Sequence, residues 1–258
     1  MRGRWTAIVL AAGRGSGDPL ARAYGVSHKC LIPVGGIPML RRVVDTLRTH
    51  PGVASIAISI EEPSVVSTAL GTAYPDVAVI PSSDSAPASA LAAVEAVASA
   101  WPILLTTADH ALLDRAMLDH FFSASEGARA DLTIGLATAE TILAAYPDAK
   151  RTFLRFGRDR VSGCNLYGLM SARALGAVDL WQRLDRDRKR PWRIVGAFGA
   201  GAIIRYALGL MDLSGALALA SRRLNLAARA VLMPFANAAV DVDKPEDKEL
   251  VEDILGRA

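Results

Sequence analysis

Short apolar runs alternate with segments of helical spacing along the first half of the chain. TAIVLAA (6–12) suits a strand buried on both faces, and MLRRVVDTLRTH (39–50) then places apolar residues at helical spacing. The strand signal recurs in SIAISI (55–60), VAVI (77–80) and PILLTTAD (102–109). Such alternation predicts an α/β fold with a mainly parallel sheet and helices on both of its faces.

The second half of the chain keeps the same pattern less regularly. ADLTIGLAT (130–138) and SGCNLYGLMS (162–171) add strands, and the chain then turns mostly helical. RAVLMP (229–234) and AAVDVD (238–243) predict a return to strand before a last helix over 245–257. No repeat or clear linker interrupts the sequence. We therefore expect a single domain over 1–258 with a mainly helical, acceptor-side insertion at about 171–228.

Composition excludes several classes of protein. No apolar run reaches the roughly 18 to 20 residues of a membrane span, and the basic start before a short apolar run only imitates a signal peptide, so we expect a cytoplasmic chain. Cys30 and Cys164 lie in no CxxC or Cys/His cluster, which argues against a zinc site or a disulfide framework. A net charge of +3 does not call for nucleic acid and is compatible with anionic small molecules.

A glycine-rich loop follows the first predicted strand in IVLAAGRGSGDPL (8–20). Ligands of open α/β sheets bind beyond the carboxyl ends of the strands, and glycines let backbone N–H groups turn toward phosphate oxygens. The spacing GxGxG, followed by Asp18 and Pro19, is neither the dinucleotide GxGxxG nor a Walker loop, because GK[ST] occurs nowhere. A phosphate-binding loop is the favoured interpretation, and a turn without a ligand is the alternative.

Other polar residues stand where they could join such a site. Lys29 precedes an apolar segment, and Asp109 ends a predicted strand, where it could hold Mg²⁺ or cap a helix. Asp241 and Asp243 alternate along a predicted strand, so only one of them can face a cation. The loop entering a helix at about Ser89 could contact a base or ribose, or could be a plain N-cap.

Taken in order, these stretches resemble the MobA-like nucleotidyltransferases, a group with the nucleotide-diphospho-sugar transferase fold. The resemblance rests on LAAGRGSGDPL, HKCLIPVGGIPML, the aspartate of TTADHALL and VDVDKPEDKELVEDI. It implies a Rossmann-like three-layer α/β/α fold with a mainly parallel, mixed central sheet. It also implies Lys29, Asp109 and Asp243 as catalytic residues, with both aspartates as ligands of Mg²⁺. The implied nucleotide-binding residues are Leu10, Ala11, Ala12, Gly13, Arg14, Gly15, Gly17, Lys29, Ser83 and Ser89.

The chain departs from the family pattern in two places. Gly17 stands where the family usually has an arginine, and Arg14 or Arg22 could replace it. Residues 139–229, where the acceptor usually binds in this group, match no family pattern. The candidate acceptor-binding residues of that region are Lys150, Arg151, Arg155 and Asn165.

The resemblance implies that an acceptor phosphate oxygen attacks the α-phosphorus of a nucleoside triphosphate and that pyrophosphate leaves. Two anions must approach each other, so catalysis depends on positioning and charge neutralisation. A non-catalytic nucleotide-binding protein with the same fold is the main alternative. A nicotinamide-dependent oxidoreductase is disfavoured because it needs a true GxGxxG.

The expected partners are a nucleoside triphosphate and a small phosphorylated acceptor: a sugar, alditol, inositol, cofactor or lipid-head-group phosphate. Peripheral membrane contact and a homodimer are left open. The apolar segment 194–213 follows the basic run 183–193, and it could pack on the sheet, bind a lipid-like acceptor, rest on a membrane or form a dimer contact. Core packing is the first expectation.

Overall fold

The computed structural model describes residues 5–13, 17–97, 100–148, 151–186 and 199–257. The chain divides into two compact units, one formed by 1–119 with 240–258 and the other by 120–239 (unit 1 and unit 2 below). The assignment of residues 1–258 to a single domain stays a prediction. In the described residues no helix is long and apolar enough to cross a membrane.

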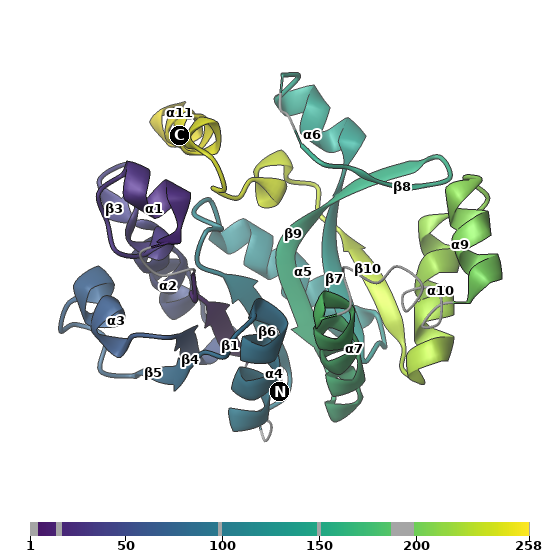
Figure 1. The fold of residues 1–258 in the computed structure, drawn as a ribbon, viewed down its shortest axis with the longest axis horizontal. Helices are drawn as coiled ribbons and strands as arrows, with labels where there is room; N and C mark the ends of the chain where they lie inside the picture. Colours follow the sequence, from purple (N-terminus) through teal and green to yellow (C-terminus); the bar gives the residue numbers. More distant parts are fainter. Residues whose placement is uncertain (1–4, 14–16, 98–99, 149–150, 187–198, 258) are drawn as a thin grey trace. The chain divides into compact units, whose positions relative to one another are not determined.

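Unit 1 is built on four parallel strands in the order β6–β1–β4–β5 (Figure 1). Ala7, Ile8 and Val9 of the first strand are completely buried, as expected for a strand with neighbours on both sides and cover on both faces. The parallel arrangement predicted from the alternating pattern is confirmed for these strands. Their bounds are β1 (Trp5–Leu10), β4 (Val53–Ile60), β5 (Val77–Pro81) and β6 (Ile103–Thr107).

The helices of unit 1 bury one apolar face each. In α2 (Met39–Thr49) the buried residues Leu40, Val43, Val44 and Leu47 recur at helical spacing, which places this face in the core. A small hairpin of β2 (Pro33–Val34) and β3 (Ile37–Pro38) turns through two glycines with positive φ. The other helical elements are α1 (Pro19–Ala23), η2 (Lys29–Leu31), α3 (Pro63–Leu70), α4 (Ala86–Ala96) and α11 (Pro245–Arg257), with α5 (Arg115–Gly127) spanning the division at 119.

Unit 2 carries the mixed part of the sheet. Strand β10 pairs with β7 in parallel, whereas β9 is antiparallel to β7 and β8 is antiparallel to β9. The predicted class, an α/β fold with a mainly parallel, mixed sheet, is therefore confirmed. The elements of unit 2 are β7 (Leu132–Thr138), α6 (Ala139–Ala145), β8 (Leu154–Phe156), β9 (Asp159–Leu169), η3 (Ala172–Ala174), α7 (Leu175–Arg186), α9 (Ala200–Ala207), α10 (Leu213–Leu224), β10 (Ala228–Leu232) and η4 (Ala236–Ala239).

The predicted strand over 238–243 is wrong. Ala238 and Ala239 end the 3₁₀ helix η4, and residues 240–242 belong to no strand. The backbone N–H of Val242 donates to the carbonyl of Asp109 at 3.2 Å, but a strand needs a continued ladder of such bonds. Asp241 and Asp243 therefore do not alternate along a strand, and strand geometry does not decide which of them faces a cation.

Candidate active site

Lys29 joins two carboxylates that lie far from it in the sequence. Its Nζ donates to Oδ2 of Asp109 at 2.7 Å and to Oδ1 of Asp243 at 2.5 Å. Lys29 opens η2, Asp109 lies two residues beyond β6, and Asp243 precedes α11, all within unit 1. The three residues predicted as catalytic are thus brought together at the carboxyl end of a parallel strand, where ligands of such sheets bind.

Further hydrogen bonds fix the orientation of both aspartates. Thr107 Oγ1 donates to Oδ1 of Asp109 at 2.6 Å, which leaves Oδ2 directed at Lys29. The carboxylate of Asp247, in the first turn of α11, accepts from the backbone N–H of Asp243 at 3.1 Å and of Lys244 at 2.9 Å. The helix N-terminus therefore holds the backbone that presents Asp243.

The ammonium of Lys29 is held in its charged form. Burial by itself would lower the pKa of Lys29, but the charges and hydrogen bonds of Asp109 and Asp243 outweigh it and raise the pKa above its ordinary value. The side chains of Lys29 and Asp109 are 19% and 21% exposed, and that of Asp243 is 60% exposed. The cluster is therefore partly screened from water and remains open to a ligand on the side of Asp243.

The donor set of this cluster fits a magnesium ion. Two carboxylates meet at one cation, the ammonium of Lys29, and Mg²⁺ is commonly held by one or two carboxylates together with water and substrate phosphates. Among the residues that the structure describes, no group of three or more His, Cys, Asp or Glu side chains forms a metal site. A magnesium ion at this cluster would have Asp109 and Asp243 as its carboxylate ligands.

A glutamate that the sequence analysis missed contacts the glycine loop. The backbone N–H of Gly13 donates to the carboxylate of Glu61, with the nitrogen 3.3 Å from Oε1 and 3.4 Å from Oε2. Oε1 also lies 3.3 Å from Nε2 of the buried His28. Glu61 comes directly after β4. The sequence signal that could have found it is an acidic residue immediately after a predicted apolar strand. A carboxylate therefore contacts an amide that the sequence analysis assigned to phosphate.

The loop itself is anchored at both ends. Ala11 N–H donates to the carbonyl of Ser59 at 2.9 Å, and the carbonyl of Leu10 accepts from Ala108 N–H at 3.0 Å. Asp18 Oδ1 accepts from Leu20 N–H and Ala21 N–H at 2.9 and 3.0 Å, so the first turn of α1 is capped by a side chain. Ala12, Gly13, Gly17 and Arg22 are exposed, whereas Arg14 and Gly15 lie outside the described residues.

The two predicted serines close their own loop. Ser89 Oγ accepts from Ser83 N–H at 2.9 Å and lies 3.2 Å from the Ser83 carbonyl, and Ser89 is 1% exposed. Ser85, whose Oγ accepts from Ala88 N–H, is the N-cap of α4, so the expected helix start at about Ser89 is wrong. Of the two predicted residues, Ser83 and Ser89, only Ser83 is exposed.

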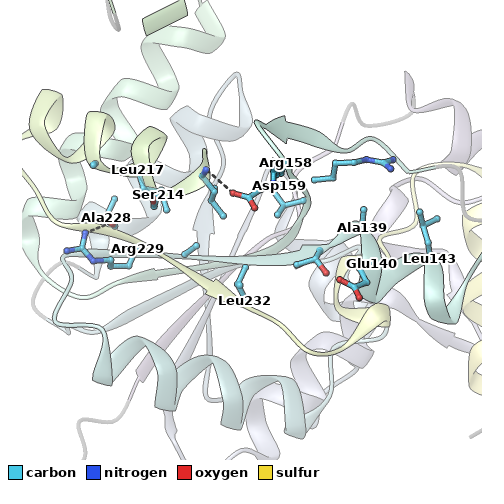
Figure 2. Close-up of a pocket in the computed structure, with 16 residues that line it drawn as sticks. Ala139, Glu140, Leu143, Arg158, Asp159, Ser214, Leu217, Ala228, Arg229 and Leu232 are labelled. Atoms are coloured by element: carbon cyan, nitrogen blue, oxygen red, sulfur yellow. Dashed lines mark hydrogen bonds between the residues drawn. The ribbon is translucent and has the colours of Figure 1, made fainter. Parts of the chain in front are cut away.

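The predicted acceptor residues lie in unit 2. Arg155 is exposed on β8, Arg151 is half-buried and Asn165 has a positive φ of 51° within β9, while Lys150 lies outside the described residues. A cavity of about 1000 Å³ in the same unit is lined by other residues, as Figure 2 shows. Its cationic side chains are Arg158, Arg160 and Arg229.

The chain has a mainly parallel sheet, a glycine loop after the first strand of that sheet, and a lysine–carboxylate cluster at the end of β6. This arrangement resembles the class of nucleoside triphosphate transferases. The model of the MobA-like NTP transferase domain matches residues 7–189, and the chain belongs to this family. The family resemblance stated from the motifs is therefore confirmed.

Individual relatives agree with this assignment. The chain is 26% identical over 215 residues to the bifunctional protein GlmU of Leifsonia xyli subsp. xyli, a match that covers 80% of this chain and 37% of that protein. A hypothetical transferase from Thermus thermophilus is 28% identical, with a TM-score of 0.78 over 95% of this chain and 99% of the other. The 4-diphosphocytidyl-2C-methyl-D-erythritol synthase of Anaerococcus prevotii, 11% identical with a TM-score of 0.64 over 100% of both chains, shares the fold.

Proposed function

We propose that the protein is a Mg²⁺-dependent nucleotidyltransferase that moves a nucleoside monophosphate group from a nucleoside triphosphate to a small phosphorylated acceptor. The observation that carries the proposal is the convergence of Lys29, Asp109 and Asp243 at 2.5–2.7 Å. Membership of the MobA-like family supports it. A cytoplasmic location is part of the proposal.

The reaction needs no covalent intermediate on the protein. An acceptor phosphate oxygen forms a bond to the α-phosphorus, the bond from that phosphorus to the bridging oxygen breaks, and pyrophosphate leaves with the electron pair. The Gly13 amide and Lys29 bind and orient phosphate oxygens, and Lys29 offsets the charge of the approaching anions. Asp109 and Asp243 would hold Mg²⁺, which supplies further charge neutralisation on the phosphates when bound.

The acceptor is assigned to unit 2. Arg151 and Arg155 offer guanidinium groups, which bind phosphate through paired hydrogen bonds, and Asn165 lies in the same unit. The resemblance implies only that the acceptor binds in this region, and the choice of residues rests on their phosphate-binding chemistry. The class of acceptor is a sugar, alditol, inositol, cofactor or lipid-head-group phosphate.

Pyrophosphate release tests the proposal. Purified protein with Mg²⁺ is given each of the four nucleoside triphosphates together with a panel of phosphorylated acceptors, and pyrophosphate is measured. Release that requires one triphosphate and one acceptor supports the transferase. If no acceptor gives release and no triphosphate protects the fold against heat, the phosphate-loop interpretation is wrong. Protection without release would instead favour a nucleotide-binding protein without catalysis.

A further inference from the structure

Several described residues of the apolar segment expected in the core are exposed instead. Sequence analysis placed 194–213 against the sheet first, yet within its described part α9 buries none of its residues. Ile204, Leu208 and Leu210 are 56%, 66% and 63% exposed. These three side chains therefore face solvent, whereas Met211 directly after them is buried.

These exposed side chains are concentrated. The described part of the chain has nine exposed large apolar residues, and four of them, including Tyr206, fall within 204–210. The Tyr206 ring also meets that of Phe156 in β8, with 5.6 Å between the centroids. Leu154, 48% exposed, lies two residues from Phe156 and so on the same face of that strand. We call Leu154, Ile204, Tyr206, Leu208 and Leu210 the α9 patch.

Positive charge adjoins the α9 patch. A cavity of about 430 Å³ between α9 and α10, helices that lie side by side in Figure 1, is lined by Arg205, Arg222 and Arg223. Its one acidic lining residue, Asp212, is engaged as the N-cap of α10, where Oδ1 accepts from Gly215 N–H at 2.7 Å. The charged side chains that line this cavity are therefore mainly cationic, although Asp159 lies near the patch and accepts from Leu213 N–H at 3.2 Å.

Apolar side chains next to arginines match the boundary of an anionic lipid bilayer. Leucine and isoleucine enter the region between headgroups and acyl chains, while guanidinium groups meet lipid phosphates. Scattered single exposed apolar residues are ordinary, but a contiguous group marks an interaction site. An anionic lipid surface offers acyl chains to the aliphatic side chains and phosphates to the arginines of the cavity at the same time.

We propose that the α9 patch rests on an anionic phospholipid membrane and that the cavity of Arg205, Arg222 and Arg223 receives a lipid phosphate. The protein would lie on the surface, since it enters only with side chains of one short helix and its neighbours. The proposal does not depend on nucleotidyl transfer, because none of these residues belongs to the Lys29 cluster or to the glycine loop.

Vesicle binding tests the proposal with the full chain. The protein is sedimented with vesicles of phosphatidylglycerol and phosphatidylcholine, and with phosphatidylcholine alone, at low and high salt. We expect binding to the anionic vesicles that weakens by at least about tenfold at high salt, because screening shortens the reach of the arginines. Absence of binding to anionic vesicles at low salt would overturn the proposal.

Variants locate the surface. Leu208→Gln with Leu210→Gln should weaken vesicle binding by at least about tenfold, and Arg205→Gln with Arg222→Gln should remove the preference for anionic lipid. Val79→Gln, at an exposed apolar position of β5 in unit 1, is the matched control and should bind as the wild type does. All of these positions are exposed, so unchanged thermal unfolding should accompany each variant.

Two results would contradict the assignment. Equal vesicle binding by the Leu208/Leu210 variant and the wild type would place the lipid surface elsewhere. A dimer that the same variant dissociates, seen by size exclusion without any vesicle binding, would make a second copy of this chain the occupant of the patch. Neither result bears on pyrophosphate release, which is measured in the absence of lipid vesicles.

Discussion

The ammonium of Lys29 lies 2.7 Å from Oδ2 of Asp109, a residue 80 positions further along the chain. The same ammonium reaches Asp243, so a single cation draws together η2, the end of β6 and the start of α11. In the proposed reaction the ammonium and the two carboxylates bind different groups. Lys29 binds phosphate, whereas Asp109 and Asp243 hold the metal ion.

Replacement of Lys29 by methionine should slow transfer on the order of 10²-fold or more, since one positive charge near the reacting phosphates is lost. Lys248→Met is the matched control, because Lys248 is also paired within unit 1, with Glu252 at 2.7 Å, and should leave transfer nearly unchanged. Steady-state rates of pyrophosphate release measure both. An equal loss of transfer rate in the two variants would show that Lys29 has no specific role in the site.

The same variant should show how stability depends on pH. The pKa of Lys29 is raised in the folded protein, so its stabilising contribution is complete below the pKa of the unfolded chain and is lost as pH rises through the folded value. We expect Lys29→Met to lower the free energy of unfolding by about 1 kcal/mol near neutral pH. In urea unfolding this difference should stay constant up to about pH 10 and shrink above it. A difference that grows with rising pH would contradict the pairing.

Asp243 and Asp241 should differ sharply in their effect. Asp243 accepts from Lys29 at 2.5 Å, so Asp243→Asn should slow transfer by roughly 10²-fold and raise the Mg²⁺ concentration that is needed. Asp241→Asn should remain within about threefold of the wild type. Titration of activity with Mg²⁺ separates the two. A loss confined to the Asp241 variant would show that the other aspartate of this segment faces the metal ion.

Glu61→Gln should strengthen the binding of triphosphate. The amide oxygen of glutamine can still accept from Gly13 N–H, but a negative charge beside the phosphate loop is removed, which is worth about 1 kcal/mol, or roughly fivefold in affinity. Glu62→Gln is the control, because the neighbouring carboxylate accepts from Ser64 Oγ at 2.6 Å instead. Calorimetric titration without acceptor gives both constants. Weaker binding by Glu61→Gln would mean that the carboxylate itself contacts the nucleotide.

Cys30 should be inert in the native protein. Burial and, to a smaller extent, the charge of Glu61 raise the pKa of its thiol to about 12, and the residue is 3% exposed. At pH 8 a disulfide reagent such as DTNB should label it only as fast as the protein opens, while the denatured chain reacts at once. Rapid labelling of Cys30 in the folded state, located by peptide mapping, would show that the segment of Lys29 is open to solvent.

The sequence predicted the strands of unit 1 better than their surroundings. A short, continuous apolar run such as that of β1 suits a strand that is covered on both faces, because such a strand buries every one of its residues. The resemblance to the MobA-like family also implied that Lys29, Asp109 and Asp243 share one site, and the structure brings them together. The segment at 240–243 was misassigned because a strand requires a hydrogen-bonded neighbour, and periodicity says nothing about where one lies.

Residues that depend on spatial neighbours escaped the sequence. Glu61 belongs to the site through its contact with Gly13, a pairing of adjacent strand ends that composition does not reveal. Ser89 has the residue type of a cap but is used to hold Ser83. The exposure of α9 was missed because an apolar helix has the same sequence whether it is covered by a core or left open.

The most direct test of the proposed site is the Asp109→Asn variant, measured for turnover and for metal-free triphosphate affinity. Asp114→Asn is its control, since Asp114 caps the following helix by accepting from Met117 N–H at 2.8 Å and asparagine can do the same. We predict that Asp109→Asn loses turnover on the order of 10²-fold or more, while triphosphate affinity without metal stays within about twofold. Undiminished turnover would show that Asp109 does not hold the metal ion and that the reaction takes place elsewhere.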